Sequence, residues 1–396
     1  MERIRAWAEV RTAPVTATVG LLVAAMAYSM HWGKPPDLWG IARSSSALAH
    51  GDFAGIYFPH APLTSPPGLE AVLAPVLALG AALGLHPLPA HAPSATHLWL
   101  LVGPAAILLG SMALFALDAV ARHWRLSPAR HMALALVGAL GIGDVVVFWG
   151  HPEDCAAVAL VVWAALALDT DTPSLRRAGW LFGLAIALQP LALLALAPVF
   201  ARCTRPEVRP LAGRLILPSL IVLLPPLAVA APHTLFVLIH QPSYPQAVSS
   251  TPFTRWAPSL GHGQAAGGPT RLASILLAAV AGFVVCRRRH QLPTVLAMAA
   301  VAFALRVLFE TELAGYYFWP VAALCLLLAL RHGWARFGVC TVAGVTCMVL
   351  GNCRVHIITL WWPAIMATTA VLLVTAVRRP TPAVECEPMI LSVSRR

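Results

Sequence analysis

The sequence predicts an all-α polytopic membrane protein. Three observations favour this fold class. Of 396 residues, 59% are hydrophobic and only 11% are charged, against about 25% charged residues in a typical soluble domain. Apolar runs close to the roughly 20 residues that one membrane-spanning helix needs recur along the whole chain. These runs are continuous rather than alternating, which favours helices over a membrane β-barrel.

Positive charge marks the orientation of the chain. The net charge is +11, and Lys34 is the only lysine. Short loops rich in arginine stay in the cytoplasm, so the sequence predicts cytoplasmic N- and C-termini. Nucleic-acid binding is excluded because it requires one basic face rather than scattered clusters. The arginines cluster at 3–11, 202–214, 287–289, 331–336 and 378–396.

A single transmembrane domain is predicted over residues 1–377, followed by a disordered cytoplasmic tail over 378–396. No small-residue cleavage site follows the first apolar run, so we interpret that run as a signal anchor and first span. Two weaker runs, 66–86 and 153–168, bring the total to about 10–12 transmembrane or re-entrant helices. The stronger candidates are 12–30, 98–121, 131–149, 178–201, 215–232, 270–286, 293–309, 317–331, 336–353 and 358–377. The bias towards Ala, Leu, Pro and Arg is typical of a high-GC bacterial genome, so with the apolar runs we expect a protein of the bacterial cell (inner) membrane.

Two long extracytoplasmic loops are expected, at 31–65 and 232–269. Loops longer than about 12–15 residues are usually functional or disordered, and the aromatic residues of the first loop argue against disorder. A helix lying in the interface is predicted over 38–49. It ends at Gly51, and Asp52 is interpreted mainly as a turn residue.

Two segments leave the topology open. If 66–86 spans the membrane, the basic loop 121–130 falls outside; if it only re-enters, that loop falls inside, as its arginines require. Segment 178–201 carries Gln189-Pro190 at its centre. Proline removes a backbone hydrogen bond in mid-helix, which predicts a broken or re-entrant helix. We favour the re-entrant version of both segments.

Acidic residues are few, and ionised groups near lipid are functional candidates by default. Asp37 follows the first span and is predicted either as a general base at the membrane surface or as a helix N-cap. Glu70 has a capping interpretation too, since a carboxylate in a first helical turn suits the helix dipole.

The segment His151-Pro152-Glu153-Asp154 carries three ionisable residues between two apolar runs. Proline at a helix start with acidic residues in the first turn explains part of this pattern. Asp144, Phe148 and His151 are spaced as residues that share one helix face. That spacing favours a functional cluster, and the sequence does not choose between Asp37 and this cluster as the proton acceptor.

Arginines outside the cytoplasm also require a reason. Arg306 and Glu310 have the spacing of a helix-surface ion pair, and Arg255 and Arg271 lie in or next to the second extracytoplasmic loop. Guanidinium groups bind phosphate well, although snorkelling to the interface is the alternative. The 15 histidines show no metal-binding pattern, so no metal and no cofactor is predicted.

One order of motifs resembles a known family. A first span is followed by Asp37, then Gly51-Asp52, Tyr57 and Pro66-Pro67-Gly68 at the start of the next apolar run. This order resembles the GT-C superfamily of membrane glycosyltransferases, and is most similar to the polyprenyl-phosphate-mannose-dependent mannosyltransferases of glycosyltransferase family 87. Gln189-Pro190 and the stretch from Arg306 to Pro320 are similar to later family features.

The resemblance implies transfer of a sugar, mannose first, from a polyprenyl-phosphate donor to a glycolipid or glycan acceptor on the extracytoplasmic face. It implies a GT-C-like bundle in the lipid bilayer, with Asp37 as the catalytic base. The other candidates divide into three groups. They are the catalytic or acceptor-binding residues Asp52, Asp144, His151, Glu153, Asp154 and Glu310; the donor phosphate-binding residues Arg255, Arg271 and Arg306; and the substrate-stacking residues Trp39, Tyr57, Trp256, Tyr316 and Tyr317.

Two other functions remain open. A transporter or flippase for a lipid-linked or anionic solute would carry paired repeats with broken helices in matching positions. A non-catalytic membrane assembly subunit would dispense with Asp37.

Overall fold

The computed structural model describes residues 11–29, 37–57, 66–84, 95–170, 173–201, 203, 205–244, 250–285, 291–353 and 358–378. Predictions that fall elsewhere, including the tail 379–396, lie outside the described residues. Six helical segments of the described chain are long and apolar enough to cross a membrane, which confirms a helical multi-pass membrane protein. They are Trp99–His123, Pro128–Trp149, Leu211–His240, Leu292–Phe309, Trp334–Asn352 and Leu360–Val377.

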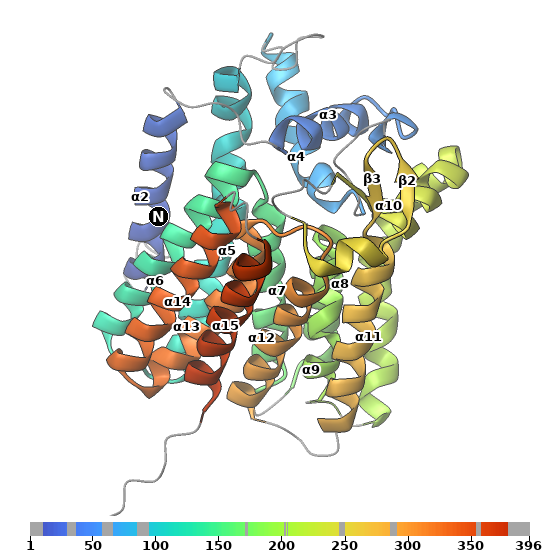
Figure 1. Cartoon of the computed structure of the whole chain (residues 1–396). Helices are drawn as coiled ribbons and strands as arrows, with labels where there is room; N and C mark the ends of the chain where they lie inside the picture. The colour runs from blue at the N-terminus through green and yellow to red at the C-terminus, as the bar shows by residue number, and fades with distance from the viewer. Residues whose placement is uncertain are drawn as a thin grey trace, which may run out of the picture.

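The helices pack as one bundle whose members run up and down in turn (Figure 1). One of them, α6, is continued by a π-helix, η2, to the end of its apolar run. The bundle helices are α2 (Thr12–Ser29), α5 (Ala95–His123), α6 (Pro128–Ile142) with η2 (Gly143–Trp149), α7 (Pro152–Ala167), α10 (Arg205–His240), α11 (Gly268–Val285), α12 (Leu292–Phe309), α13 (Trp319–His332), α14 (Trp334–Asn352) and α15 (Ile358–Val377).

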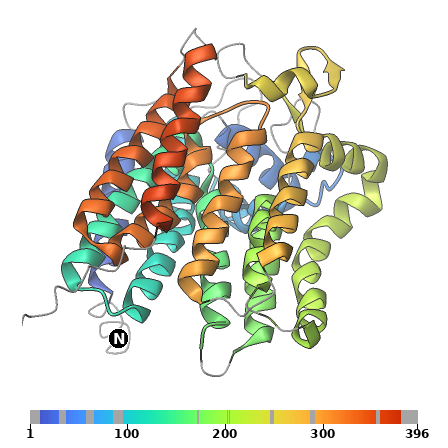
Figure 2. The same cartoon turned by 60° about the horizontal axis from the view of Figure 1, so that its bottom comes forward.

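The centre and the edge of the bundle differ in burial. Helix α13 is buried at every residue from Trp319 to Leu330, and α7 is buried from Pro152 to Val162. Helix α10 lies at the edge (Figure 2) and exposes large apolar side chains such as Ile221, 57% exposed. A helix that is apolar on all sides belongs in a core or in lipid. Helices α7 and α13 therefore form the core, and α10 faces lipid.

The predicted break at Gln189-Pro190 is confirmed. Helix α8 (Leu175–Leu188) ends at Gln189, whose backbone is extended, and the chain continues as the short helices η3 (Pro190–Ala195) and α9 (Leu196–Phe200). Pro190 has no N–H, so the α-helical bonding cannot pass through it. Gly179 lies against Leu211 and Arg214, and Gly183 against Leu215 and Pro218. Helices α8 and α10 therefore run parallel, and the chain between them doubles back.

Helix α4 (Gly68–Ala82) stays at one end of the bundle. The end of α2 contacts the start of α5, because the Trp99 indole donates a hydrogen bond to Ala25 O at 3.3 Å. The chain leaves α2 and enters α5 at the same end of the bundle. Helix α4 lies between them in the sequence, so it does not need to cross the bundle. The α5–α6 turn lies at the opposite end from α3 and α4 (Figure 1).

The end of the bundle that holds α4 also carries helix α3 (Leu38–Ala49), the predicted interfacial helix, and the turn η1 (Gly55–Tyr57) (Figure 1). A small antiparallel sheet lies beside them, in the strand order β1-β3-β2. The all-α prediction did not include this sheet. The strands are β1 (Pro242–Ser243), β2 (Ser259–Gly261) and β3 (Gln264–Ala266), with the short helices η4 (Pro252–Trp256) and η5 (Gly315–Phe318) nearby.

The second loop begins later than the predicted 232–269. Helix α10 continues to His240 beyond a kink at Ala230, where φ is −139° and ψ is 45°. Pro232 follows the kink and lacks the N–H that a regular helix would use there. The helix resumes after the proline, so the first nine residues assigned to the loop, 232–240, belong to α10.

Candidate functional site

A cavity of about 350 Å³ lies between α3, α4, the start of α7, the end of α8 and the β1 strand. Its volume falls in the range of roughly 300–1,000 Å³ that is usual for small-molecule sites. Ionisable side chains from five separate helices face it. The polar lining residues are Asp37, Glu70, His151, Glu153, Gln189, Gln241, Ser243, Tyr244, Arg271, Arg306, Glu312, Tyr316 and Tyr317.

Helix starts converge on this cavity and explain its acidity. Asp37 is the N-cap of α3, Glu70 lies in the first turn of α4, and Glu153 and Asp154 lie in the first turn of α7. The N-terminus of a helix carries partial positive charge and stabilises a nearby carboxylate. This local preference accounts for acidic residues at these positions, but it does not decide what their side chains contact.

Asp37 makes no capping hydrogen bond. Its Oδ2 lies 2.8 Å from Nε2 of His151, and Nδ1 of the same imidazole lies 2.6 Å from Oε1 of Glu153. Tyr316 stacks on the imidazole at 4.3 Å between ring centroids. These contacts form a carboxylate–imidazole–carboxylate chain, in which Asp37 is the most exposed member at 32%.

The charge of His151 follows from its neighbours. Burial by itself disfavours the imidazolium, but the Glu153 and Asp37 carboxylates outweigh burial and raise the pKa of His151 well above its ordinary value. The two carboxylates therefore favour the protonated form of the ring. The ring fixes Asp37 in place and leaves the second oxygen of that carboxylate available.

The buried Arg306 and the partly buried Arg271 share one carboxylate. Arg271 Nε lies 2.9 Å from Glu310 Oε1, and its Nη1 donates to Gln241 Oε1 at 2.7 Å. Arg306 Nε donates to the same Glu310 oxygen at 3.2 Å. This geometry matches the ion pair expected four residues apart on a helix. A guanidinium has five N–H donors, so both arginines keep donors beyond these contacts.

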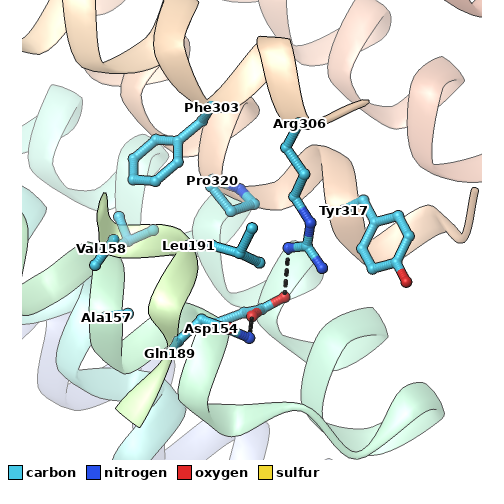
Figure 3. A pocket seen from close by; sticks show the side chains of 10 residues that line it. Asp154, Ala157, Val158, Gln189, Leu191, Phe303, Arg306, Tyr317 and Pro320 are labelled. Atoms are coloured by element: carbon cyan, nitrogen blue, oxygen red, sulfur yellow. Dashed lines mark hydrogen bonds and ion pairs between the residues drawn. The ribbon is translucent and has the colours of Figure 1, made fainter. Parts of the chain in front are cut away.

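Behind the cavity, Arg306 reaches the first turn of α7. Its guanidinium points at Asp154, with Nη1 3.6 Å from Oδ2, and lies 4.0 Å over the ring of Tyr317 (Figure 3). Gln189 donates its side-chain amide to the other Asp154 oxygen. Burial, with Glu310, raises the pKa of Tyr317 to about 12, so its hydroxyl remains neutral.

The break in α8 supplies that amide. Because the helix stops at Gln189, the side chain reaches across to Asp154 instead of following the helix surface. A void of about 10 Å³, close to the size of one water, remains between Asp154, Gln189, Phe303 and Arg306 (Figure 3). The interrupted helix therefore positions a polar group as well as turning the chain.

The structure brings together nine of the residues singled out from the sequence. Seven of them line the cavity itself, and Asp154 and Glu310 hold its arginines. The nine are Asp37, His151, Glu153, Asp154, Arg271, Arg306, Glu310, Tyr316 and Tyr317.

Five other candidates lie away from it. Asp52 accepts a hydrogen bond from the Gly55 N–H at 2.9 Å in a turn, as its turn interpretation predicts. Tyr57 packs into a small core with Ile56 and Val237. The three others do not line the cavity either: Trp39, which Arg43 covers at 5.5 Å; Arg255, which is exposed; and Trp256, which is 76% exposed.

The prediction that Asp144, Phe148 and His151 share one helix face is wrong. Residues 143–149 form a π-helix, and Gly150 then adopts a left-handed conformation with φ 88°. Both features change the rotation per residue on which the expected spacing depends. Asp144 instead accepts a hydrogen bond from Asn352 at 2.8 Å and does not line the cavity.

Some lining residues were missed or underrated. Gln241 was not predicted, and it lies in no motif that could have drawn attention to it. Glu312 lies within the Arg306–Pro320 stretch but was given no role of its own. Glu70 was interpreted mainly through the helix dipole, although it lines the cavity. Its position directly after Pro66-Pro67-Gly68 was the available signal.

No known protein-family model matches the chain, and no curated protein and no solved structure is significantly similar to it. Within the described part of the chain, no three His, Cys, Asp or Glu side chains converge in a way that could hold a metal ion. What the site can do therefore follows from its side chains. It offers a carboxylate paired with an imidazolium, two guanidinium groups and stacked aromatic rings around one cavity.

Proposed function

We propose that the protein is a GT-C-type membrane glycosyltransferase, a bundle of about 10–12 transmembrane or re-entrant helices. It transfers a sugar, mannose first, from a polyprenyl-phosphate donor to a hydroxyl of a glycolipid or glycan acceptor. One observation carries the proposal. Asp37, paired with His151 at 2.8 Å, lines the same cavity as Arg271 and Arg306.

In this reaction Asp37 acts as the general base. The acceptor O–H bond breaks and its proton passes to the Asp37 carboxylate. The acceptor oxygen then bonds to the anomeric carbon, while the bond from that carbon to the phosphate oxygen breaks and its electron pair leaves on the polyprenyl phosphate. His151, anchored by Glu153, orients Asp37 for this proton transfer.

Arg271 and Arg306 stabilise the leaving phosphate through donors that their contacts with Glu310 and Asp154 leave available. Preorganised donors in a water-poor site are effective because they need no reorganisation during the reaction. Glu310 holds both guanidinium groups in place between turnovers. Tyr316 and Tyr317 give the cavity the aromatic faces on which a sugar ring can stack.

The charge distribution supports an extracytoplasmic cavity in a bacterial cell membrane. The α5–α6 turn lies at the end of the bundle opposite α3 and α4 and carries Arg122, Arg125 and Arg130. The turn between α13 and α14 carries Arg331 and Arg336. Arginine-rich turns stay inside, which leaves the cavity on the outer side, where lipid-linked sugar donors are used by enzymes of this type.

The test is transfer of radiolabelled mannose from polyprenyl-phosphate-mannose by the purified full-length protein in detergent. The wild-type protein should transfer the label to a mannoside acceptor, and Asp37→Ala should not, although it elutes as the same monodisperse species. If the folded wild-type protein leaves the donor intact while proteoliposomes containing it move the donor across the bilayer, the transporter alternative replaces this proposal.

A further inference from the structure

Glu70 is placed by an unusually close contact between two helices. A Cβ atom at Gly68 would lie 2.1 Å from Ala187 O and 2.9 Å from Leu188 N. Only glycine allows this approach, and Pro67-Gly68 therefore presses the first turn of α4 against the end of α8. The contact sets Glu70 into the cavity wall beside Leu188 and Gln189.

The Glu70 carboxyl group is buried and makes no hydrogen bond to the described residues. The residue is 1% exposed, and neither of its side-chain oxygens has a hydrogen-bond partner among the described residues. Oε2 of Glu153, another lining residue, is in the same condition. Buried polar groups are nearly always paired, and an unpaired one costs stability. Three unpaired oxygens in the wall of one cavity indicate a binding site for a ligand that carries hydrogen-bond donors.

Among the described residues, the cations that line the cavity already contact other groups, and none of them donates to these three oxygens. Arg306 contacts Glu310 and Asp154, Arg271 contacts Glu310 and Gln241, and His151 is held by Asp37 and Glu153. In the empty protein these three oxygens therefore have no donor, and a ligand that enters the cavity can supply one. A sugar presents several O–H donors side by side, and one of them must reach Asp37 for the proposed reaction.

We infer that Glu70, with the free oxygen of Glu153, binds hydroxyl groups of the acceptor sugar next to the hydroxyl that Asp37 deprotonates. Glu70 is then an acceptor-specificity residue, and this role rests on the proposed function. A stabilising role for Glu70 at the start of α4 makes the opposite prediction for stability. A ligand-binding carboxylate without partners should cost stability in the empty protein, whereas a stabilising one should add to it.

The experiment compares the wild-type protein with Glu70→Leu and Glu70→Gln, all full length in detergent. The donor is polyprenyl-phosphate-mannose and the acceptor probe is octyl α-D-mannopyranoside. Glu70→Leu should raise KM for the octyl mannoside by about 10-fold, because a hydrogen bond to a buried polar group is lost, and should leave KM for the donor within about twofold. Its Tm without ligand should equal or exceed that of the wild type. Glu70→Gln keeps hydrogen-bonding groups and should raise the acceptor KM less.

Asp169→Asn is the matched control, since it also removes a carboxylate but lies at the far end of α7, 2.9 Å from His123. It should change neither KM. A lowered Tm with an unchanged acceptor KM in Glu70→Leu overturns the acceptor role and leaves the proposed function standing. A wild-type protein that transfers no mannose from the donor overturns the proposed function and this role together. A wild-type protein that transfers mannose to another acceptor, but neither uses the octyl mannoside nor gains Tm from it, overturns this role alone.

Discussion

Two clusters at opposite ends of the bundle use the same chemical groups differently. At the α5–α6 turn, Asp118 is 3% exposed, and its two oxygens lie 2.7 Å from Arg122 Nε and 2.6 Å from His131 Nδ1. At the other end, Asp37 contacts His151, while the Glu70 oxygens and one oxygen of Glu153 have no hydrogen-bond partner in the described part of the chain. We call these the Asp118 cluster and the Asp37 cluster.

The two clusters differ in how many of their carboxylate oxygens lack a hydrogen-bond partner among the described residues. Both oxygens of Asp118 are satisfied by its own helix and the next one, so the Asp118 cluster ties α5 to α6 and has no oxygen left to bind a ligand. The Asp37 cluster surrounds a cavity with acceptors that the protein does not fill. Buried polar groups that are fully paired serve architecture, and those left unpaired beside a cavity indicate a ligand.

The largest effect that would distinguish the two clusters is expected on turnover, from a substitution in the Asp37 cluster. Asp37→Asn removes the base but keeps the shape of the side chain, so the rate of mannose transfer should fall by about 10²–10⁴-fold, while Tm changes little because Asp37 is a third exposed. Transfer assays and thermal unfolding on the same preparation measure both. A variant that retains turnover within a few-fold would remove Asp37 from the mechanism.

The next largest effect is on stability at the other end. Asp118→Ala leaves His131 and Arg122 without their carboxylate, and breaking a buried ion pair costs about 3–5 kcal/mol. The low end applies, since Arg122 is 30% exposed and water can solvate it. Tm should fall by several degrees while the turnover per folded molecule stays unchanged. Loss of turnover without loss of Tm would contradict the architectural role.

A smaller effect concerns pH. Because Glu153 and Asp37 raise the pKa of His151, the protonated ring stabilises the fold. That stability is fully present below the ordinary histidine pKa of about 6.5 and is lost as pH rises through the raised value in the folded protein. The excess of the wild-type Tm over that of His151→Gln should therefore be largest near pH 6 and shrink at higher pH. Thermal unfolding across this range tests it, and an excess that does not change with pH would contradict a charged His151.

The smallest effect is expected at Asp52, a residue predicted from the sequence as a site candidate that lies outside the cavity. Asp52→Asn keeps the acceptor for the Gly55 N–H, and exposed substitutions away from special features usually change stability by less than about 0.5 kcal/mol. Turnover should stay within about twofold of the wild type. A large loss in the transfer assay would extend the site beyond the cavity.

The sequence by itself determined the local features of this protein. Long apolar runs place the spans, Pro190 stops α8, and the start of α3 directly after Asp37 agrees with the predicted helix over 38–49. Each of these depends on neighbouring residues only, through backbone bonding and hydropathy. The prediction that Asp144 and His151 share a helix face was wrong, because a π-helix and a left-handed Gly150 change the rotation per residue between them.

Only the tertiary structure decided which polar residues meet. Asp37 and His151 are 114 residues apart, and Glu310 pairs with Arg271 on another helix as well as with Arg306 on its own. Most of the spanning helices are apolar on all sides, so their periodicity does not say which face turns to which neighbour. That choice depends on close fits such as Gly141 against the Trp319 ring and Gly68 against Ala187. Packing of this kind is set by shape, which the pattern of hydrophobic residues does not encode.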